Sequence, residues 1–472
     1  MTIDRKECDF DRERVPWGMQ RLPPQVHGGG GAKLRRVLSR GDLVIYGLTI
    51  ITPTAAYPVF GIVQEVSRGH AALAYLVAVV AMLFTAASYG HMAAAFPSAG
   101  STYTYARRAL HDYVGFLAGW SMMLDYVLVP LLSGVYVSIT ATRLVPSVPY
   151  AVWAFLFAAT ITMVNVRGIR VTARTSKWMM LAMTVSAVLF VALAIRWALL
   201  AMGWGGLLQP DLVLNLETFE LPPLMTAAAI GTLSYLGFDA VSTLAEDTKN
   251  PEKDIGFATL TVCVLQAGFC FLITYLAAVV WSPAKPFPNV ETAILDVASI
   301  IGGTGMFGFT TFILLLAAVA SSVTSQAGAS RLLFGMGRDG ILPKRIFAYI
   351  DPVHATPTRS IYLMGIISFL GALVISFQLI VELVNFGAFV GFILVNLSVV
   401  RHYYLQEKRR GFRALFRYLI FPSLGAIVCA YVWSSLGVNS KILGFGWLTL
   451  GLIYLAVMTR GFRLPMKDIE IV

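Results

Sequence analysis

Long apolar runs separated by short polar segments make up most of this chain. Twelve runs have roughly the 20 residues that a helix needs to cross the hydrocarbon core of a bilayer. They cover residues 42–65, 71–95, 113–142, 149–167, 176–202, 222–246, 256–281, 305–335, 360–376, 380–401, 415–436 and 441–459. Backbone polar groups in lipid must be hydrogen-bonded within their own segment, so each run is predicted to be a helix. The pattern predicts an all-α membrane protein with 12 transmembrane helices and polar tails at 1–41 and 461–472.

The composition excludes the usual soluble classes. Of 472 residues, 57% are hydrophobic and 13% are charged, whereas a soluble protein has roughly 25% charged residues. The four cysteines form no C-x-x-C pair, so we expect neither a disulfide framework nor a metal site. No ATP-binding motif, metalloprotease motif or nucleophile elbow is present. We therefore expect no enzyme, no metal and no organic cofactor.

The basic residues are distributed by topology. The chain has 36 Lys and Arg against 25 Asp and Glu, a net charge of +11. With both termini in the cytoplasm, the tails and inner loops hold 31 of these 36 basic residues, as cytoplasmic loops of membrane proteins commonly do. The positive charge thus predicts orientation in a lipid bilayer, and no nucleic-acid partner.

Two of the predicted helices contain interruptions at corresponding places. The first carries Thr52, Pro53, Thr54 and Ala55 in mid-span, and a proline there removes a backbone donor and disturbs the helix. The sixth, five spans later, carries glycines and an acid within residues 231–239. Interrupted spans at matching positions of two halves indicate an inverted-repeat transporter and its binding site. The alternative is that each break is an ordinary kink, since Pro and Gly are common in membrane helices.

Three acids lie inside the apolar runs and not at a first or last residue, with no Lys or Arg at mid-depth. They are Asp125, Asp239 and Glu382. A charge near the bilayer centre costs several kcal/mol, so we expect these side chains to face a polar cavity, where they attract an ammonium group or exchange a proton. Glu382, close to one end of its run, is equally consistent with a side chain that reaches the interface. Asp239 is equally consistent with a tether for the broken helix.

Aromatic residues concentrate around the two breaks. Tyr57 follows the first, and Tyr235 and Phe238 lie within the second. Aromatic faces suit both the alkyl part and the ammonium of an amine, and Phe238 is the best candidate for a gate. Ordinary packing is the alternative for each ring.

Several motifs resemble the amino acid–polyamine–organocation superfamily. These are residues 96–108 (FPSAGSTYTYARR), 115–120 (GFLAGW), 234–239 (SYLGFD), 245–251 (AEDTKNP) and 329–343 (ASRLLFGMGRDGILP). Within the superfamily the chain is most similar to putrescine importers, through Thr52-Pro53, residues 124–126 (LDY), 384–387 (VNFG) and 395–398 (VNLS).

The resemblance implies a LeuT-type fold of two inverted repeats of five helices plus two additional helices. The first repeat would span 42–202, the second 222–402, and the added helices 415–460. It also implies a substrate pocket at the breaks of helices 1 and 6. The implied substrate-lining residues are Thr52, Pro53, Thr54, Ala55, Asp125, Ser234, Tyr235, Phe238, Ser325 and Asn385.

Two departures from the superfamily pattern bear on the substrate and the coupling ion. Amino acid carriers present a Gly-rich break in helix 1 that binds the substrate carboxylate, and this chain has Pro53 there, which favours an amine. Some proton-coupled members place a lysine within helix 5, where this chain has Met183. Serines and threonines at 321–324 could hold Na⁺, although small hydroxyls also serve helix packing.

The sequence therefore predicts a secondary transporter of a small cationic amine such as putrescine in a bacterial inner membrane, working by alternating access. An ion gradient of H⁺ or Na⁺, or exchange, would supply the energy, with Asp125, Asp239 and Glu382 as proton-coupling candidates. The alternative is an amino acid carrier of the same fold. A channel, which would need a continuous polar pore, is the less favoured class.

Overall fold

The computed structural model describes residues 38–97, 101–168, 173–245, 248–282, 285–338, 344–352, 354 and 356–462. These residues belong to one unit, Arg36–Val472. Most of the predicted tail at 1–41, and the chain after residue 462, lie outside the described residues.

Helices dominate the described residues, and the one β-bridge joins Leu38 to Thr248. Several spans are divided by short 3₁₀ (η) segments. The α-helices are α1 (Arg40–Ile51), α2 (Phe60–Val66), α3 (Ala71–Ala95), α4 (Ser101–Ala109), α5 (Asp112–Leu144), α6 (Tyr150–Val166), α7 (Ala173–Met202), α8 (Leu221–Gly231), α9 (Pro251–Val280), α10 (Ala293–Arg338), α11 (Lys344–Phe347), α12 (Thr358–Val374), α13 (Phe377–Val399), α14 (Phe412–Leu415), α15 (Phe421–Ser434) and α16 (Val438–Met458). The 3₁₀ segments are η1 (Tyr57–Val59), η2 (Trp204–Leu207), η3 (Pro210–Leu212), η4 (Thr232–Tyr235), η5 (Asp239–Leu244) and η6 (Val290–Thr292), and the π-helical segments are η7 (Val400–Gln406) and η8 (Phe416–Ile420).

The apolar runs of the sequence correspond to these helices. Among the described residues, nine helical segments are long and apolar enough to cross a membrane, and α6 and α12 are shorter apolar helices. The remaining run is divided between α1 and α2. The prediction of an all-helical, multi-pass membrane protein is thus confirmed.

Two features differ from the pattern-based expectation. The segment after α3, expected as a loop, forms the short helix α4, which a search for long apolar runs does not detect. The run predicted from 305 begins earlier, because α10 starts at Ala293 and bends where Gly302 and Gly303 leave helical geometry. Glycine at 303 accommodates a φ of 63°, which other residues adopt only at a cost.

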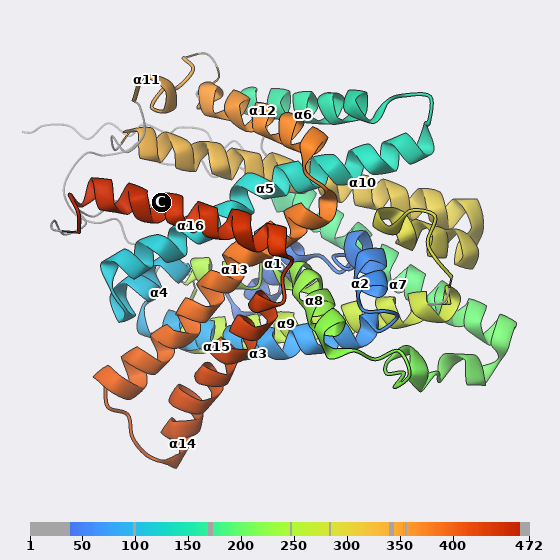
Figure 1. Ribbon diagram of the computed structural model, residues 1–472, viewed down its shortest axis with the longest axis horizontal. Helices are drawn as coiled ribbons and strands as arrows, with labels where there is room; N and C mark the ends of the chain where they lie inside the picture. The colour runs from blue at the N-terminus through green and yellow to red at the C-terminus, as the bar shows by residue number, and fades with distance from the viewer. Residues whose placement is uncertain are drawn as a thin grey trace, which may run out of the picture. The chain divides into compact units, whose positions relative to one another are not determined.

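Two groups of helices pack side by side in Figure 1. In the upper part α5, α6, α10 and α12 lie against one another, and in the lower part α3 lies against α8 and α9. Where α3 crosses α9, a Cβ on Gly90 would meet the Cα of Gly256 at 2.5 Å. Small residues at a crossing let two helix backbones approach closely, which strengthens packing in lipid. This contact holds α3, the second predicted span, against α9, which follows the break in the sixth span.

The start of α1 is defined by local capping. The Ser39 hydroxyl accepts from the Asp42 N–H at 3.4 Å, and the Ser39 N–H donates to the Asp42 carboxylate at 2.9 Å. This reciprocal pair satisfies two donors at the helix start. Arg40 also forms an ion pair with Asp254 of α9 at 2.9 Å. We call the end of the bundle where α1 begins the tail side, and the other end the far side.

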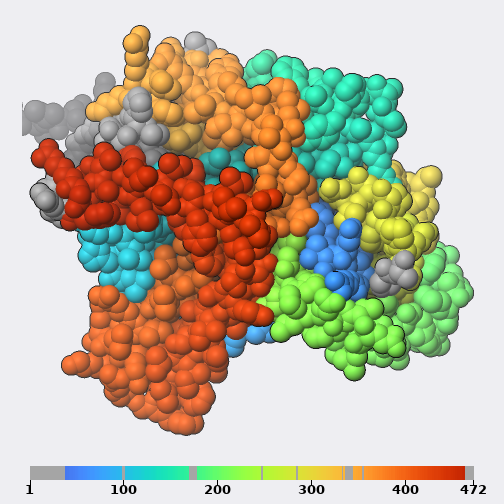
Figure 2. All heavy atoms as spheres, viewed as in Figure 1, coloured from blue at the N-terminus to red at the C-terminus, as the bar shows by residue number. Residues whose placement is uncertain are grey.

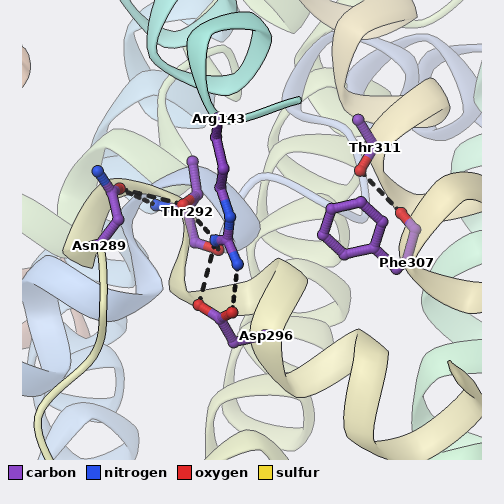
Figure 3. A network of polar contacts seen from close by, with 6 residues as sticks. All are labelled: Arg143, Asn289, Thr292, Asp296, Phe307 and Thr311. Atoms are coloured by element: carbon purple, nitrogen blue, oxygen red, sulfur yellow. Dashed lines mark hydrogen bonds and ion pairs between the residues drawn. The ribbon is translucent and has the colours of Figure 1, made fainter. Parts of the chain in front are cut away.

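A polar network joins three elements on the far side of the bundle (Figure 3). Arg143, at the end of α5, donates to the Thr292 hydroxyl at 2.6 Å and forms an ion pair with Asp296 of α10. Asn289 accepts from the N–H and the hydroxyl of Thr292, both at 3.0 Å. The network therefore joins α5, the η6 segment and α10 at one point. Because η6 also packs on α2, the second half of the first span is attached to the same network.

Candidate functional site

The break in the first span lies where the prolines predict it. The helix α1 ends at Thr52, whose φ of 64° lies outside the helical region, and the chain resumes helical structure at η1. Within the break, the Ala55 N–H donates to the Thr52 carbonyl at 3.1 Å and the Tyr57 N–H donates to the Thr54 carbonyl at 2.9 Å. Pro53 carries no N–H. Several donors that a substrate carboxylate would need are therefore absent or already used.

The break in the sixth span lies between the 3₁₀ segments η4 and η5. After α8 and η4, Leu236 is extended and Gly237 has a φ of +112°. A Cβ at position 237 would also meet the Ile50 Cγ2 of α1 at 2.5 Å. Glycine is required here both for the left-handed backbone and for the close approach of the two breaks. The Gly237 N–H donates to the Asp239 carboxylate at 3.3 Å, so this donor too is used within the chain.

Hydrogen bonds tie the two breaks together. The Ser234 hydroxyl donates to the Ala55 carbonyl at 3.1 Å and lies 3.2 Å from the Tyr75 hydroxyl. Gln266 of α9 donates to the Ser234 carbonyl at 3.0 Å, and Tyr235 donates to the Tyr75 carbonyl at 3.1 Å. Ser234 and Tyr235 therefore lie at the junction, as expected, with their hydroxyl groups engaged by the protein.

Two acids lie in the same region, beside the breaks. Asp125 of α5 and Asp239 at the start of η5 are both partly buried, and their carboxyl groups lie within range of direct electrostatic interaction. Tyr126 lies near both acids and near Tyr46 of α1. The Tyr46 hydroxyl is also close to Asp239. We call Tyr46, Asp125, Tyr126 and Asp239 the acid–tyrosine cluster.

The cluster combines negative charge with aromatic rings in a way that suits a cation. Two like charges repel each other, and a proton or a cation between them relieves the repulsion. Tyrosine rings attract ammonium groups through their faces. Tyr46 and Tyr126 are 38% and 49% exposed, whereas Tyr57 and Phe60 beyond the break are buried. The tyrosines of the cluster are thus exposed, whereas the chain beyond the break is packed.

The other predicted residues take different places. Phe238 is buried among aromatic rings, with centroids 5.6 Å from Tyr89 and 5.2 Å from Phe392. Tyr57 packs on Phe190 and donates to the Ser186 carbonyl of α7. Pro53 and Thr54 are buried in the helix-1 break, and Ser325 is half-buried on α10.

Glu382 is bonded away from the acid–tyrosine cluster. Its carboxylate accepts from the Gly437 N–H before α16 and from Gln378 of its own helix, both at 2.9 Å. The side chain is buried within the protein. Its bonds link α13 to the start of α16.

Asn385 supports the end of α8. Its amide donates to the carbonyls of Ala229 and Ile230 at 2.8 and 3.2 Å. These carbonyls lie in the last turn of α8, where intrahelical donors run out, and the Ile230 carbonyl also accepts from the Thr232 N–H. Gln266 does the same for the carbonyl of Ser234. Asn385 was expected to line the pocket and Gln266 was not identified from the sequence, although a glutamine inside an apolar run is a usable signal.

Replacing Asn385 by alanine is expected to destabilise the protein by about 1–3 kcal/mol, because two buried carbonyls lose their donor. Thermal unfolding of the purified protein in detergent would measure the effect. Asn439→Ala is the matched control, since Asn439 is exposed on α16. Equal unfolding temperatures for the two variants would show that the Asn385 bonds do not support the break.

Tyr46 was also missed by sequence reasoning. Many tyrosines lie in the apolar runs, and nothing in the sequence distinguishes the one that meets Asp239. Tyr126 appeared only within the motif at 124–126 (LDY). The pairing of the two tyrosines depends on how the tertiary structure places α1 and α5, which periodicity does not reveal.

In this apolar helical bundle, two interrupted spans meet beside partly buried acids. Together these features define a multi-pass membrane transporter. Residues 44–457 match the family model described as amino acid permease. The chain belongs to this family, within the amino acid–polyamine–organocation superfamily, and is a transporter and not an enzyme.

Relatives with established names cover 79–93% of this chain. It is 33% identical over 445 residues to the low-affinity putrescine importer PlaP of Escherichia coli. This alignment covers 93% of this chain and 97% of the relative. It is 25% identical over 465 residues to the branched-chain amino acid permease BcaP of Bacillus subtilis, covering 91% and 94% of the two chains. It is 27% identical over 401 residues to the vacuolar cationic amino acid transporter 4 of Arabidopsis thaliana, covering 79% and 64%.

Proposed function

We propose that this protein imports a small organic diamine, of the putrescine type, across a bacterial inner membrane. The observation that carries the proposal is the acid–tyrosine cluster, where two carboxyl groups and two tyrosine rings lie together beside the breaks. Similarity to a bacterial putrescine importer over 93% of the chain supports the same substrate class. Asp125 and Asp239 bind the ammonium groups in this proposal, and one of them exchanges a proton during transport.

The arrangement of backbone donors favours an amine over an α-amino acid. The N–H groups of Ala55, Tyr57 and Gly237 all have acceptors within the chain. A substrate carboxylate would have to displace these bonds, whereas an ammonium donates and meets two acidic acceptors. An amino acid permease function remains the second candidate, and the similarity to the branched-chain permease supports it.

The proposal includes twelve spans with both termini in the cytoplasm. We count α1, η1 and α2 as one interrupted span, together with the nine long helical segments and the short apolar helices α6 and α12. The distribution of basic residues supports the orientation. The breaks at residues 52–56 and 232–238 support two inverted repeats of five spans, with α15 and α16 outside them.

The exposures support alternating access, with this conformation open to the tail side. Tyr46 and Tyr126 are exposed, and on the far side Arg143 joins α5 to Thr292 and Asp296 (Figure 3). Opening toward the far side would require η6 to separate from α2 or from Arg143. Phe238, packed between Tyr89 and Phe392, would leave that aromatic contact if it acts as a gate.

Competition for uptake separates the two candidate substrates. Purified protein in proteoliposomes is expected to accumulate labelled putrescine, and unlabelled diamines are expected to inhibit this uptake in preference to leucine or arginine. Liposomes without protein are the control. If only neutral amino acids were taken up and competed with one another, the diamine proposal would be wrong and the amino acid candidate would stand.

A further inference from the structure

A basic recess lies on the tail side, in the connection between α13 and α15. Its cavity of about 480 Å³ is lined by Arg410, Gly411, Phe412, Arg413, Ala414, Arg417 and Tyr418. In Figure 1 this connection is the loop at the lower end of the orange helices, next to α14. Figure 2 shows the same region as the orange lobe at the lower left. The recess is remote in sequence from the acid–tyrosine cluster and plays no part in the proposed substrate site.

Three guanidinium groups line the recess without neutralising acids. Arg410 stacks on the ring of Tyr404 at 4.2 Å, and Arg417 donates through its Nε to His91 at 2.7 Å. Within the described ranges, no carboxylate pairs with Arg410, Arg413 or Arg417. The nearby acid, Glu407, is engaged by Arg409 at 2.6 Å and by His402 at 3.1 Å. The recess thus concentrates positive charge that the protein itself leaves uncompensated.

A stripe of exposed phenylalanines runs from the recess toward the apolar part of α15. The rings of Phe412 and Phe416 lie 4.9 Å apart, and those of Phe416 and Phe421 lie 6.1 Å apart. Phe412 is 77% exposed. The π-helical segment η8 takes more residues per turn than an α-helix, so side chains spaced by four and then five residues stay on one face. Phe421 packs on Phe84 of α3, which anchors the stripe to the bundle.

We propose that this recess, with the stripe, binds an anionic phospholipid. The phosphate of the head group lies between the guanidiniums of Arg410, Arg413 and Arg417, since arginine binds phosphate oxygens through paired N–H donors. One acyl chain lies along Phe412 and Phe416. Basic pockets at the cytoplasmic ends of membrane helices are suited to such head groups. Orientation by positive charge alone would explain the arginines, but it requires neither a cavity nor an aligned row of exposed rings.

The test measures lipid binding directly, so its failure and that of the transport proposal can be told apart. The full-length protein in detergent is titrated with phosphatidylglycerol, phosphatidylcholine or inorganic phosphate, and retained lipid is quantified by native mass spectrometry alongside the unfolding temperature. We expect phosphatidylglycerol to bind and to raise the unfolding temperature, and the other two ligands to do neither at equal concentration. Comparable binding of phosphatidylcholine would overturn the proposal, and a response to inorganic phosphate equal to that of phosphatidylglycerol would show a free-anion site instead of a lipid site.

Variants locate the site. The double change Arg410→Gln and Arg413→Gln is expected to weaken phosphatidylglycerol binding about 25-fold. This is because each basic residue lost near an anionic head group weakens binding about fivefold. Arg410→Lys with Arg413→Lys should retain most of the binding. Arg167→Gln is the matched control, because Arg167 is an exposed arginine on the tail side at the end of α6. Phe412→Ala with Phe416→Ala should weaken binding of the diacyl lipid. Undiminished affinity in both the double glutamine variant and the double alanine variant would place the lipid elsewhere.

Discussion

Asp125→Asn is expected to raise the putrescine concentration for half-maximal uptake by about 10- to 100-fold. A hydrogen bond to a charged partner contributes about 1.5–3 kcal/mol, and about 1.4 kcal/mol corresponds to a factor of ten. The Asp125 carboxyl group makes no hydrogen bond within the part of the chain that the structure describes, so the amide should leave the fold unperturbed. Initial rates of uptake into proteoliposomes over a range of substrate concentrations measure the effect.

Two comparisons make this prediction specific. Asp211→Asn is the matched control, since Asp211 is an exposed acid in η3, and its uptake should equal that of the unmodified protein. If Asp125 exchanges the proton and does not bind the amine, then exchange of internal for external substrate should persist while uptake driven by a proton gradient fails. Unchanged affinity together with unchanged pH dependence of uptake would remove Asp125 from both roles.

Gly237→Ala is expected to abolish most uptake. A left-handed backbone at a residue other than glycine costs about 1–2 kcal/mol, and the new Cβ would lie 2.5 Å from the Ile50 Cγ2. The substitution therefore pushes the two breaks apart and moves Asp239 away from the other members of the acid–tyrosine cluster. Uptake and thermal unfolding, measured on the same preparation, report the functional and the structural effects.

The neighbouring side chain allows the two causes to be separated. Adding Ile50→Ala removes the steric conflict and leaves the backbone cost, so the double variant should recover part of the uptake. Gly205→Ala is the control, because no atom lies within 4 Å of a Cβ built at this exposed position in η2. Normal uptake by Gly237→Ala would show that the approach of the two breaks is not needed for transport.

Much of the fold could be predicted because lipid imposes simple constraints on sequence. A span must be apolar and internally hydrogen-bonded, so each predicted run has a helical counterpart, and α3 has the predicted bounds 71–95. The break at Pro53 was predictable for the same reason, since proline cannot complete the helical ladder. The short helix α4 and the bend at Gly303 were not predicted, because neither changes the average hydropathy of a long run.

The candidate site was predicted less completely. Asp125 and Asp239 could be identified because a charge in an apolar run is conspicuous, and the structure brings their carboxyl groups near each other. Glu382 met the same criterion, yet it bonds to the Gly437 N–H. Ser234 and Asn385 were expected to line the pocket, and in this conformation their polar groups hold backbone carbonyls instead. Polarity indicates that a side chain needs a partner, and the fold decides which partner it meets.

The sequence by itself determined the membrane class, the spans, the two interruptions and the acids, because each of these depends on one segment and its solvent. Only the tertiary structure decided that Tyr46 joins Tyr126 at the two acids, that Gln266 and Asn385 support the broken helix, and that Arg143 joins α5 to Thr292 and Asp296 on the far side. These pairings join residues up to 193 positions apart, as in Tyr46 and Asp239, only through the crossing of helices, and the crossing is set by packing across the whole bundle.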